Sequence, residues 1–315
     1  MKILIIQQRY GIGDMVIFLP YIHAISKKFN TPISLLAKES SKASDLLGED
    51  KHVDEIITLD KEKDGVSGFF KLSNELKKRK FDKVFIFNSS LRYNWISKFC
   101  KIRSYQYPLA FRSKKDVIFH SAKVFTESVT GEIVSTQPKI YLSEKTIQKA
   151  KEKYKFDKNV CHIVLGISAS GKTKIVETEI YIRLAESLSQ NKKCKFYIAA
   201  GKNDQSLINK ILNSKVGKDC ISFSNLSIKD TLPIIKHADL FCGNDSGFLH
   251  ISSGLNIKCL GLFVDSPAYS YSAYSNKIEV IVPEGETIET TTHDTLGRDR
   301  ISFDKILSKA NQMLF

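Results

Sequence analysis

Residues 238–263 read ADLFCGNDSGFLHISSGLNIKCLGLF, and this stretch decides the fold. Its pattern predicts a strand that ends at Cys242, a polar glycine turn, a short helix over 246–253 and a second strand over 258–263. A helix that starts at the carboxyl end of a parallel strand presents unpaired N–H groups and the positive end of its dipole. Both features bind anions, so the turn is predicted to bind phosphate. The alternative is that Asn244, Asp245 and Ser246 only cap the helix.

Strands and helices alternate along the rest of the chain. Apolar runs predict strands over 2–7, 32–37, 53–59, 83–88, 161–167, 195–200, 220–223 and 278–283. Periodic apolar positions predict helices over 14–29, 40–48, 66–80, 143–155, 177–190, 204–213 and 227–236, and from Ser302 to the end. Alternating β and α units predict an α/β fold with parallel sheets that carry helices on both faces.

A polar stretch at 156–159 interrupts this alternation, and we place a domain boundary there. The prediction is two doubly wound, Rossmann-like domains over 1–156 and 157–300, since 315 residues suffice for about two domains. Ligands of such folds bind at the carboxyl ends of the strands, so we expect them in a cleft between the two sheets. The terminal helix, 301–315, is predicted to pack back towards the N-terminal domain.

The chain is basic, with 48 lysines and arginines against 34 acidic residues and a formal charge of +14. This charge predicts an acidic partner, and composition alone leaves nucleic acid, an anionic membrane surface and a phosphorylated substrate open. Basic and aromatic residues are interleaved over 92–123, where Arg92, Arg103 and Arg112 stand among aromatic side chains. The segment carries no RNA-binding signature, and it suits lipid headgroups as well as RNA. A solvated lysine-rich face is the third interpretation.

The cysteines and the apolar runs indicate the compartment. Six scattered cysteines without Cys-x-x-Cys pairs are typical of reduced thiols in the cytosol, and no metal-ligand spacing is present. The apolar run at 3–6 is too short for a signal peptide and leads into a glycine turn. The chain has no apolar stretch near the roughly twenty residues that a membrane span needs. We expect a cytoplasmic protein without a metal centre.

The first predicted strand leads into the turn Gly11-Ile12-Gly13-Asp14. Gly11 and Gly13 allow a tight turn and the close approach of a ligand. The pattern does not continue to the third glycine of a dinucleotide fingerprint, so we reject binding of NAD. Asp14 stands at the start of a helix that faces the expected cleft, a position that suits a general base. Helix capping is the alternative for this carboxylate.

Gly166–Thr173 matches the Walker A pattern Gly-x-x-x-x-Gly-Lys-Thr and follows a predicted strand. A P-loop also needs an acidic residue after a neighbouring strand to hold magnesium, whereas strands 83–88 and 195–200 lead into Asn88 and Gly201. A P-loop nucleotide hydrolase therefore stays an alternative. In either fold this loop, with Ser168 and the lysines Lys172 and Lys174, can bind a diphosphate.

Two further positions are weaker candidates for binding the nucleotide. Asn203 and Asp204 follow the strand 195–200 and can accept hydrogen bonds from ribose hydroxyls, although helix capping is the interpretation that we favour. His250 lies one helical turn after Ser246, so it either faces the same phosphate or points into the core.

The segment Gly243–His250, followed by Leu262-Phe263, resembles the Asp-Thr/Ser-Gly-x-x-His element of glycosyltransferase family 9, the heptosyltransferases. In that family the element follows Ala-Asp, as it follows Ala238-Asp239 here. The N-terminus is similar too, with the initial Met-Lys-Ile-Leu, Gly13-Asp14 and a proline six residues later, Pro20. The family's Lys-x-Trp-Pro falls on Lys174, with Val176-Glu177 in place of Trp-Pro, and its Gly-Pro-Thr-Asp-Pro is shortened to Val264–Pro267.

This resemblance implies a GT-B fold and an inverting, metal-independent transfer of a sugar, heptose from ADP-heptose, to a lipopolysaccharide-type acceptor. It implies that Asp14 is the catalytic base and that Lys174, Asp245, Ser246 and Gly247 bind the donor's diphosphate. Arg92, Arg103 and Arg112 lie where such enzymes recognise acceptors. The expected partners are a nucleotide sugar, a lipid-linked or phosphorylated glycan and the anionic inner face of the cytoplasmic membrane, without nucleic acid or a further cofactor. A non-catalytic RNA-binding protein is the remaining alternative.

Overall fold

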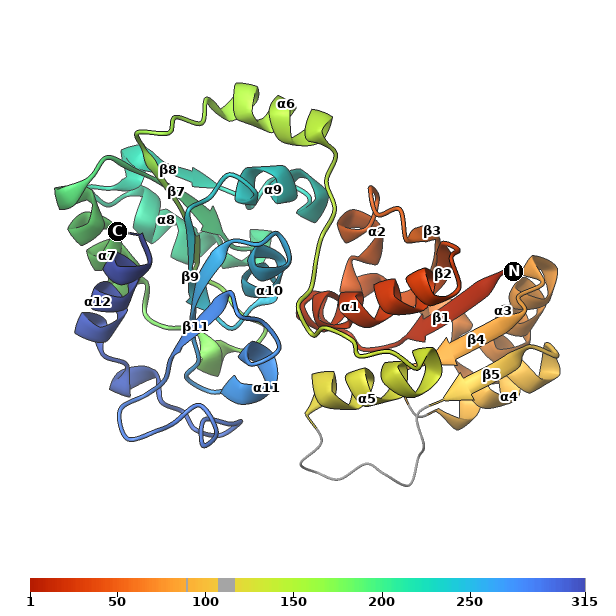
Figure 1. Ribbon diagram of the computed structural model, residues 1–315. Helices are drawn as coiled ribbons and strands as arrows, with labels where there is room; N and C mark the ends of the chain where they lie inside the picture. Colours follow the sequence, from red (N-terminus) through yellow and green to blue (C-terminus); the bar gives the residue numbers. More distant parts are fainter. Residues whose placement is uncertain (89, 107–116, 315) are drawn as a thin grey trace. The chain divides into compact units, whose positions relative to one another are not determined.

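The computed structural model describes residues 1–88, 90–106 and 117–314 and divides into two compact units, Met1–Tyr141 and Leu142–Phe315 (Figure 1). The boundary lies earlier than the predicted 156. Tyr141 packs against the rings of His23 and His52 of unit 1, at centroid distances of 5.4 and 5.7 Å. The next helix, α6 (Glu144–Tyr154), packs instead against a helix of unit 2, so these residues join the second core.

Unit 1 is built on a five-stranded sheet in which every pairing is parallel. In spatial order, the strands are β3 (Val53–Leu59), β2 (Ile33–Lys38), β1 (Ile3–Gln7), β4 (Lys83–Ile86) and β5 (Arg103–Gln106). The connecting helices are α1 (Ile12–Lys28), α2 (Ala43–Leu46), α3 (Gly65–Arg79), α4 (Leu91–Phe99) and α5 (Ile118–Thr130). The chain reverses its direction across the sheet between β1 and β4, and ligands of doubly wound folds bind at such a point.

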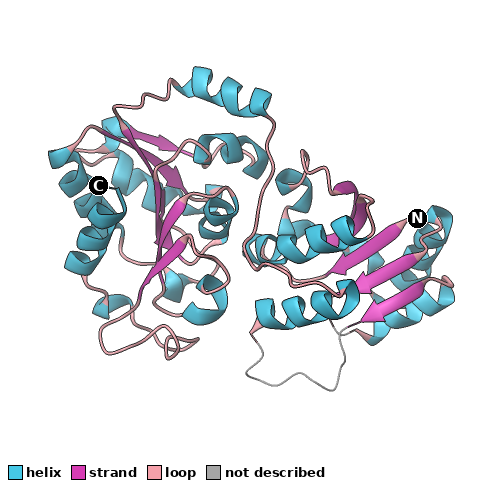
Figure 2. Ribbon diagram, in the orientation of Figure 1, coloured by secondary structure: helices cyan, strands magenta, loops and turns pink. Residues whose placement is uncertain are grey.

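Helices cover both faces of this sheet, as the continuous apolar runs of its strands require (Figure 2). Side chains of α3 and α4, including Leu72, Leu76 and Ile96, pack on one face with Leu4, Ile6 and Val84. On the other face α1 packs against α5, and Phe125 of α5 meets Phe87 edge to face at 5.5 Å.

Unit 2 has a six-stranded sheet, again entirely parallel. In spatial order, its strands are β11 (Ile278–Ile281), β10 (Lys258–Leu262), β9 (Leu240–Asn244), β6 (Cys161–Gly166), β7 (Cys194–Ala199) and β8 (Cys220–Ser222). Its helices after α6 are α7 (Thr178–Asn191), α8 (Gln205–Leu212), α9 (Ile228–Ile235), α10 (Gly247–Gly254), α11 (Ala268–Ser272) and α12 (Phe303–Leu314). The direction in which the chain crosses this sheet reverses between β6 and β9.

The terminal helix corrects one prediction. Ile306 and Ala310 of α12 are buried in the core that α7 and α8 form on one face of the unit 2 sheet. α12 contacts α7, β9 and β10, because its apolar stripe completes this core. The helix therefore belongs to the core of unit 2, from which the predicted domain bounds had left it out.

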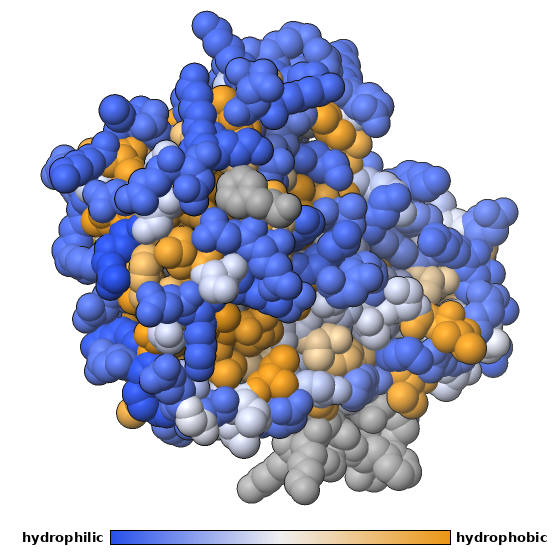
Figure 3. All heavy atoms as spheres, turned by 60° about the vertical axis from the view of Figure 1, so that its left-hand side comes forward, coloured by the Kyte–Doolittle hydropathy of each residue, from blue (hydrophilic) through white to orange (hydrophobic). Residues whose placement is uncertain are grey.

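The predicted strands and helices are present within a few residues of their expected ends, but the segment 91–130 contains structure that the sequence did not predict. It holds α4, β5 and α5, with a gap at 107–116 that lies outside the described residues. No helix in the described part of the chain is long and apolar enough to cross a membrane. Hydrophilic side chains cover most of the face drawn in Figure 3, where hydrophobic ones form small groups.

Candidate functional site

The turn after β9 in unit 2 has the geometry of an anion site. β9 ends at Asn244 at the point where the strand order reverses, and α10 begins at Gly247 with Ser246 as its N-cap residue. The hydroxyl of Ser246 makes no capping hydrogen bond to this helix. Capping by Ser246 was part of the alternative explanation for this segment, and the structure does not support it. The backbone N–H of Leu249 is bonded to the carbonyl oxygen of Ser246 at 3.1 Å, so the N–H groups that precede it in the turn are the ones that a ligand can bind.

A buried carboxylate lies directly before this turn. Asp245 Oδ2 is 3.0 Å from Lys174 Nζ, and its Oδ1 is 3.4 Å from His250 Nε2. The other ring nitrogen of His250, Nδ1, is 2.7 Å from the hydroxyl of Tyr274. Asp245, His250 and Tyr274 are buried, whereas the Lys174 side chain keeps 17% of its surface exposed. Lys174 is therefore the member of this cluster that can reach a ligand.

The cluster fixes the charge of Asp245. Burial alone would raise the pKa of this carboxyl, but the hydrogen bond and charge of His250 and the charge of Lys174 hold the pKa well below its ordinary value. Asp245 was expected to bind the diphosphate, and in the structure its carboxylate is the counter-ion of Lys174. Of the two orientations left open for His250, the structure shows the one that faces the core, where its ring contacts Asp245.

Asn244 joins the two loops that follow β6 and β9. Its Oδ1 accepts hydrogen bonds from the backbone N–H of Val176, at 3.1 Å, and from the hydroxyl of Tyr181, at 2.8 Å. This amide therefore holds the segment that carries Lys174 against the anion-binding turn. Among the described residues, Asn244 Nδ2 and Ser246 Oγ are buried polar atoms without a hydrogen-bond partner. Ser246 Oγ stands at the start of α10, where a bound ligand can satisfy it.

The loop that matches Walker A does not have the structure of a P-loop. A P-loop leads directly into a helix at its Gly-Lys-Thr, whereas Lys172–Lys174 form one 3-10 turn and α7 begins only at Thr178. Gly166 is still part of β6, and a Cβ there would lie 2.3 Å from the Phe241 ring, so packing explains this glycine. Lys172 is exposed and Ser168 half-buried, beside the segment that presents Lys174.

A second link holds this loop from its other side. Asp265, which follows β10, is hydrogen-bonded to the hydroxyl of Thr173 and accepts the backbone N–H of Leu296 at 3.0 Å. Burial would raise the pKa of Asp265, but these hydrogen bonds lower it below its ordinary value. Sequence reasoning missed Asp265, Tyr181 and Tyr274, because their partners lie far away in the chain.

In unit 1, Asp14 stands in the first turn of α1, beyond the carboxyl end of β1. Its Oδ1 accepts a hydrogen bond from Arg9 Nε at 2.7 Å, and its Oδ2 accepts the backbone N–H of Gly11 at 3.3 Å. Its side chain keeps 14% of its surface exposed. The carboxylate therefore caps α1, as the alternative interpretation required, and remains accessible to a small reacting group. Arg9 is a partner that the sequence analysis did not identify.

The turn around Asp14 is shaped by its neighbours. A Cβ at Gly11 would come within 3.1 Å of Asp14 Oδ2, so this glycine gives the carboxylate room, while Gly13 is buried in α1. After the neighbouring strand β4, Asn88 accepts the backbone N–H of Gln8 at 3.3 Å. The loops after β1 and β4 are thus tied together at the point where the strand order reverses.

The remaining candidates have structural roles or lie elsewhere. Asp204 accepts the backbone N–H of Gly201 at 3.2 Å, which confirms capping as its favoured role, and Asn203 is exposed. Arg92 has a structural role, since it donates to the carbonyl oxygens of Gly65 and Lys63, both at 2.7 Å, and its part in binding the acceptor stays a prediction. Arg103 is exposed on β5 and lies over the Tyr105 ring. Arg112 lies outside the described residues.

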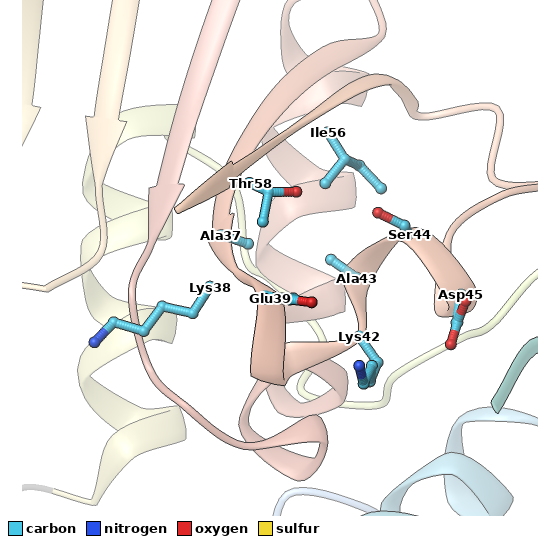
Figure 4. Close-up of a pocket in the computed structure, with 9 residues that line it drawn as sticks. All are labelled: Ala37, Lys38, Glu39, Lys42, Ala43, Ser44, Asp45, Ile56 and Thr58. Atoms are coloured by element: carbon cyan, nitrogen blue, oxygen red, sulfur yellow. The ribbon is translucent and has the colours of Figure 1, made fainter. Parts of the chain in front are cut away.

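Unit 1 also contains a cavity of about 300 Å³ at the ends of β2 and β3 (Figure 4). Its charged lining residues are Lys38, Glu39, Lys42 and Asp45. Two lysines and two carboxylates give the cavity no preference for an anion. Lys38 also points to the loop before α1, with its Nζ 3.2 Å from the centre of the Tyr10 ring. Across the ranges that the structure describes, no group of three or more His, Cys, Asp or Glu side chains could hold a metal ion.

Comparison with known proteins identifies the family of this chain. A family model described as glycosyltransferase family 9 (heptosyltransferase) matches residues 69–298. Lipopolysaccharide heptosyltransferase 1 of Campylobacter coli is 24% identical over 156 residues, which are 48% of this chain. The match spans less than half of that relative, 45% of its length.

Solved structures show the same fold over the whole chain. The ADP-heptose lipopolysaccharide heptosyltransferase II of E. coli has a TM-score of 0.79 at 18% identity and covers 100% of this chain and 98% of its own. A family 9 glycosyl transferase from Veillonella parvula has a TM-score of 0.78 at 15% identity, and the match covers 99% of this chain and 97% of that structure. E. coli heptosyltransferase WaaC with ADP has a TM-score of 0.75 at 11% identity, and the match covers 99% of this chain and 100% of that structure. The predicted α/β fold of GT-B type is thereby confirmed.

Proposed function

Since the chain belongs to glycosyltransferase family 9, the heptosyltransferases, we propose that it transfers heptose from ADP-heptose to a hydroxyl of a lipopolysaccharide core, with inversion at the anomeric carbon. The observation that carries the proposal is the uncapped N-terminus of α10 beside Lys174, at the point where the strand order of unit 2 reverses. The names of the relatives, two of which mention ADP-heptose or ADP, support the choice of donor.

In this proposal unit 2 binds the diphosphate of the donor. The ammonium of Lys174 and the backbone N–H groups of Ser246 and Gly247 neutralise the charge that develops on the leaving diphosphate. Asp245 holds Lys174 in place at 3.0 Å, His250 holds Asp245, and Tyr274 holds His250. Because protein groups supply this positive charge, we propose a reaction that needs neither a metal ion nor a further cofactor.

Asp14 is the proposed general base. It removes the proton of the acceptor hydroxyl while the hydroxyl oxygen forms a bond to the anomeric carbon, and the bond from that carbon to the diphosphate breaks. The proton ends on Asp14, and ADP leaves with the electron pair of the broken bond. The ion pair with Arg9 and the hydrogen bond from Gly11 orient the carboxylate.

The acceptor is proposed to be a lipid-linked or phosphorylated glycan, with nucleic acid playing no part. A nucleotide sugar is a cytoplasmic substrate, so we place the reaction at the cytoplasmic face of the inner membrane. The basic charge of the chain, +14, suits an acceptor that carries phosphates.

Thermal unfolding in the presence of nucleotide sugars tests the donor. A ligand that binds only the folded protein at 100 times its Kd stabilises it by about 2.7 kcal/mol, which moves Tm by about 5–10 °C for a unit of this size. We expect ADP-heptose and ADP to raise Tm, and UDP- and GDP-linked sugars to have little effect. A larger shift with a UDP- or GDP-linked sugar would replace ADP-heptose as the donor, and no shift with any of them would contradict a donor site.

A further inference from the structure

Helices α3 and α4 of unit 1 carry exposed apolar stripes. Val66 and Phe70 lie one turn apart on α3, and their exposed fractions are 78% and 51%. Leu91, Trp95 and Phe99 follow each other at the same spacing along α4, with exposed fractions of 62%, 62% and 44%. Residues four apart share one face of a helix, so each stripe is continuous. Other side chains of both helices, such as Leu76 and Ile96, already fill the core.

The two stripes form one surface, which we call the α3–α4 surface. The rings of Phe70 and Phe99 are 6.2 Å apart, edge to face. Arg92 fixes the first turn of α4 to the beginning of α3 through its two hydrogen bonds to backbone carbonyl oxygens. Five of the large apolar residues that unit 1 exposes are therefore gathered on two packed helices, which marks an interaction surface.

The charge around these stripes is positive. The two helices together contain one acidic residue, Glu75, and six basic ones, Lys71, Lys77, Lys78, Arg79, Arg92 and Lys98. Lys71 and Arg79 are engaged in ion pairs with carboxylates. Within the described ranges, Lys77, Lys78 and Lys98 form no ion pair.

Two of these unpaired lysines lie beside the apolar stripes. Lys98 Nζ lies 5.3 Å from the centre of the Trp95 ring, and Lys77 Nζ lies 3.7 Å from the centre of the Phe99 ring. Aromatic side chains flanked by lysines whose ammonium groups have no carboxylate partner suit the boundary between lipid headgroups and acyl chains.

We propose that the α3–α4 surface docks the protein on a bilayer that contains anionic phospholipid. The apolar stripes enter the headgroup region while the lysines bind phosphates of the lipid. Choosing a bilayer among anionic partners rests on the proposed function, because a lipid-linked acceptor lies in a membrane. The surface differs from the basic segment 92–123 that the sequence singled out, since half of it comes from α3.

Sedimentation with vesicles tests the proposal without measuring transfer. The full chain is mixed with phosphatidylcholine vesicles, with or without 30 mol% phosphatidylglycerol, and the bound fraction is measured at low and high salt. We expect binding only to the anionic vesicles and its loss in high salt. Trp95→Ala should lower the partition coefficient about tenfold, because less apolar area enters the bilayer. Lys98→Ala should lower it about fivefold, because one positive charge near the anionic lipid is lost.

The matched controls lie on other surfaces. Ile133→Ala removes an apolar side chain that is 94% exposed, and Lys149→Ala removes an exposed lysine of α6, so both should bind vesicles as the unaltered protein does. Equal losses in control and surface variants would overturn the proposal, as would unaltered binding by Trp95→Ala.

Two other partners would also overturn it. The first outcome is self-association that Trp95→Ala abolishes while anionic vesicles are not bound. The second is binding of single-stranded RNA through the same residues without binding of vesicles. Failure of the donor to shift Tm would contradict the proposed function and leave the vesicle result standing.

Discussion

The substitution Asp245→Asn tests whether the buried cluster of unit 2 supports the fold as the structure indicates. The carboxylate is ion-paired with Lys174 at 3.0 Å and with His250 at 3.4 Å, and its side chain is only 6% exposed. An asparagine keeps the shape of the side chain and removes its charge. The ammonium of Lys174 then stays partly buried without a counter-ion.

The expected cost follows from this geometry. Breaking a buried ion pair by removing one partner costs about 3–5 kcal/mol. The lower end applies here, because Lys174 keeps 17% of its side-chain surface in water. We therefore expect unit 2 to lose about 3 kcal/mol, which lowers its Tm by about 6–12 °C. Asp230→Asn, at an exposed carboxylate of α9, should cost less than about 1 kcal/mol.

Thermal unfolding followed by circular dichroism measures the difference, and its dependence on pH adds a second test. The pKa of Asp245 is lowered in the folded state, so its contribution to stability is complete above the unfolded value of about 4. The contribution is lost as the pH falls from about 5 towards the folded-state pKa. The stabilities of the two proteins should therefore converge in acid. An Asp245→Asn protein as stable as the unaltered one at pH 7, or a difference that grows in acid, would refute the reasoning.

Two further predictions concern the loop between β6 and α7. Lys174→Ala should weaken binding of ADP about 10- to 100-fold in calorimetry, since a charge-assisted hydrogen bond contributes about 1.5–3 kcal/mol, whereas Lys172→Ala should change it less than about threefold. The reverse order would restore the P-loop interpretation. Gly166→Ala should destabilise unit 2 by about 1–3 kcal/mol in urea unfolding, because the new Cβ lies 2.3 Å from the Phe241 ring. Gly171→Ala, with its nearest neighbour atom at 3.9 Å, is the control, and equal effects would contradict this explanation.

The parallel sheets were predictable because their strands are buried on both faces and read as continuous apolar runs. The segment 238–263 shows this well, since its strand, turn, helix and strand lie within two residues of the predicted bounds. The segment 91–99 shows the opposite case. α4 has one apolar stripe in the core and another on the surface, so its sequence lacks the one-sided periodicity of an amphipathic helix.

The site was predictable in its residues but not in its contacts. Glycines, a carboxylate and a lysine after strands indicate an anion site, and the resemblance to family 9 selects Asp14 and Lys174 among them. The sequence could not show that Asp245 meets Lys174, 71 positions earlier. It also left open which way His250 faces, because a helix position next to a binding turn can point to the ligand or to the core. Only the packing of His250 against Tyr274 decides this.

The central claim is that Asp14 removes the acceptor proton while unit 2 binds the nucleotide sugar. The most direct measurement is the release of ADP from ADP-heptose in the presence of a lipopolysaccharide core acceptor, for the unaltered protein, for Asp14→Asn and for the control Asp60→Asn, whose carboxylate caps a different turn. We expect kcat of Asp14→Asn to fall about 10²- to 10⁴-fold while the Kd of ADP stays unchanged, and Asp60→Asn to retain full activity. Full activity of Asp14→Asn, or no turnover by the unaltered protein, would contradict the claim.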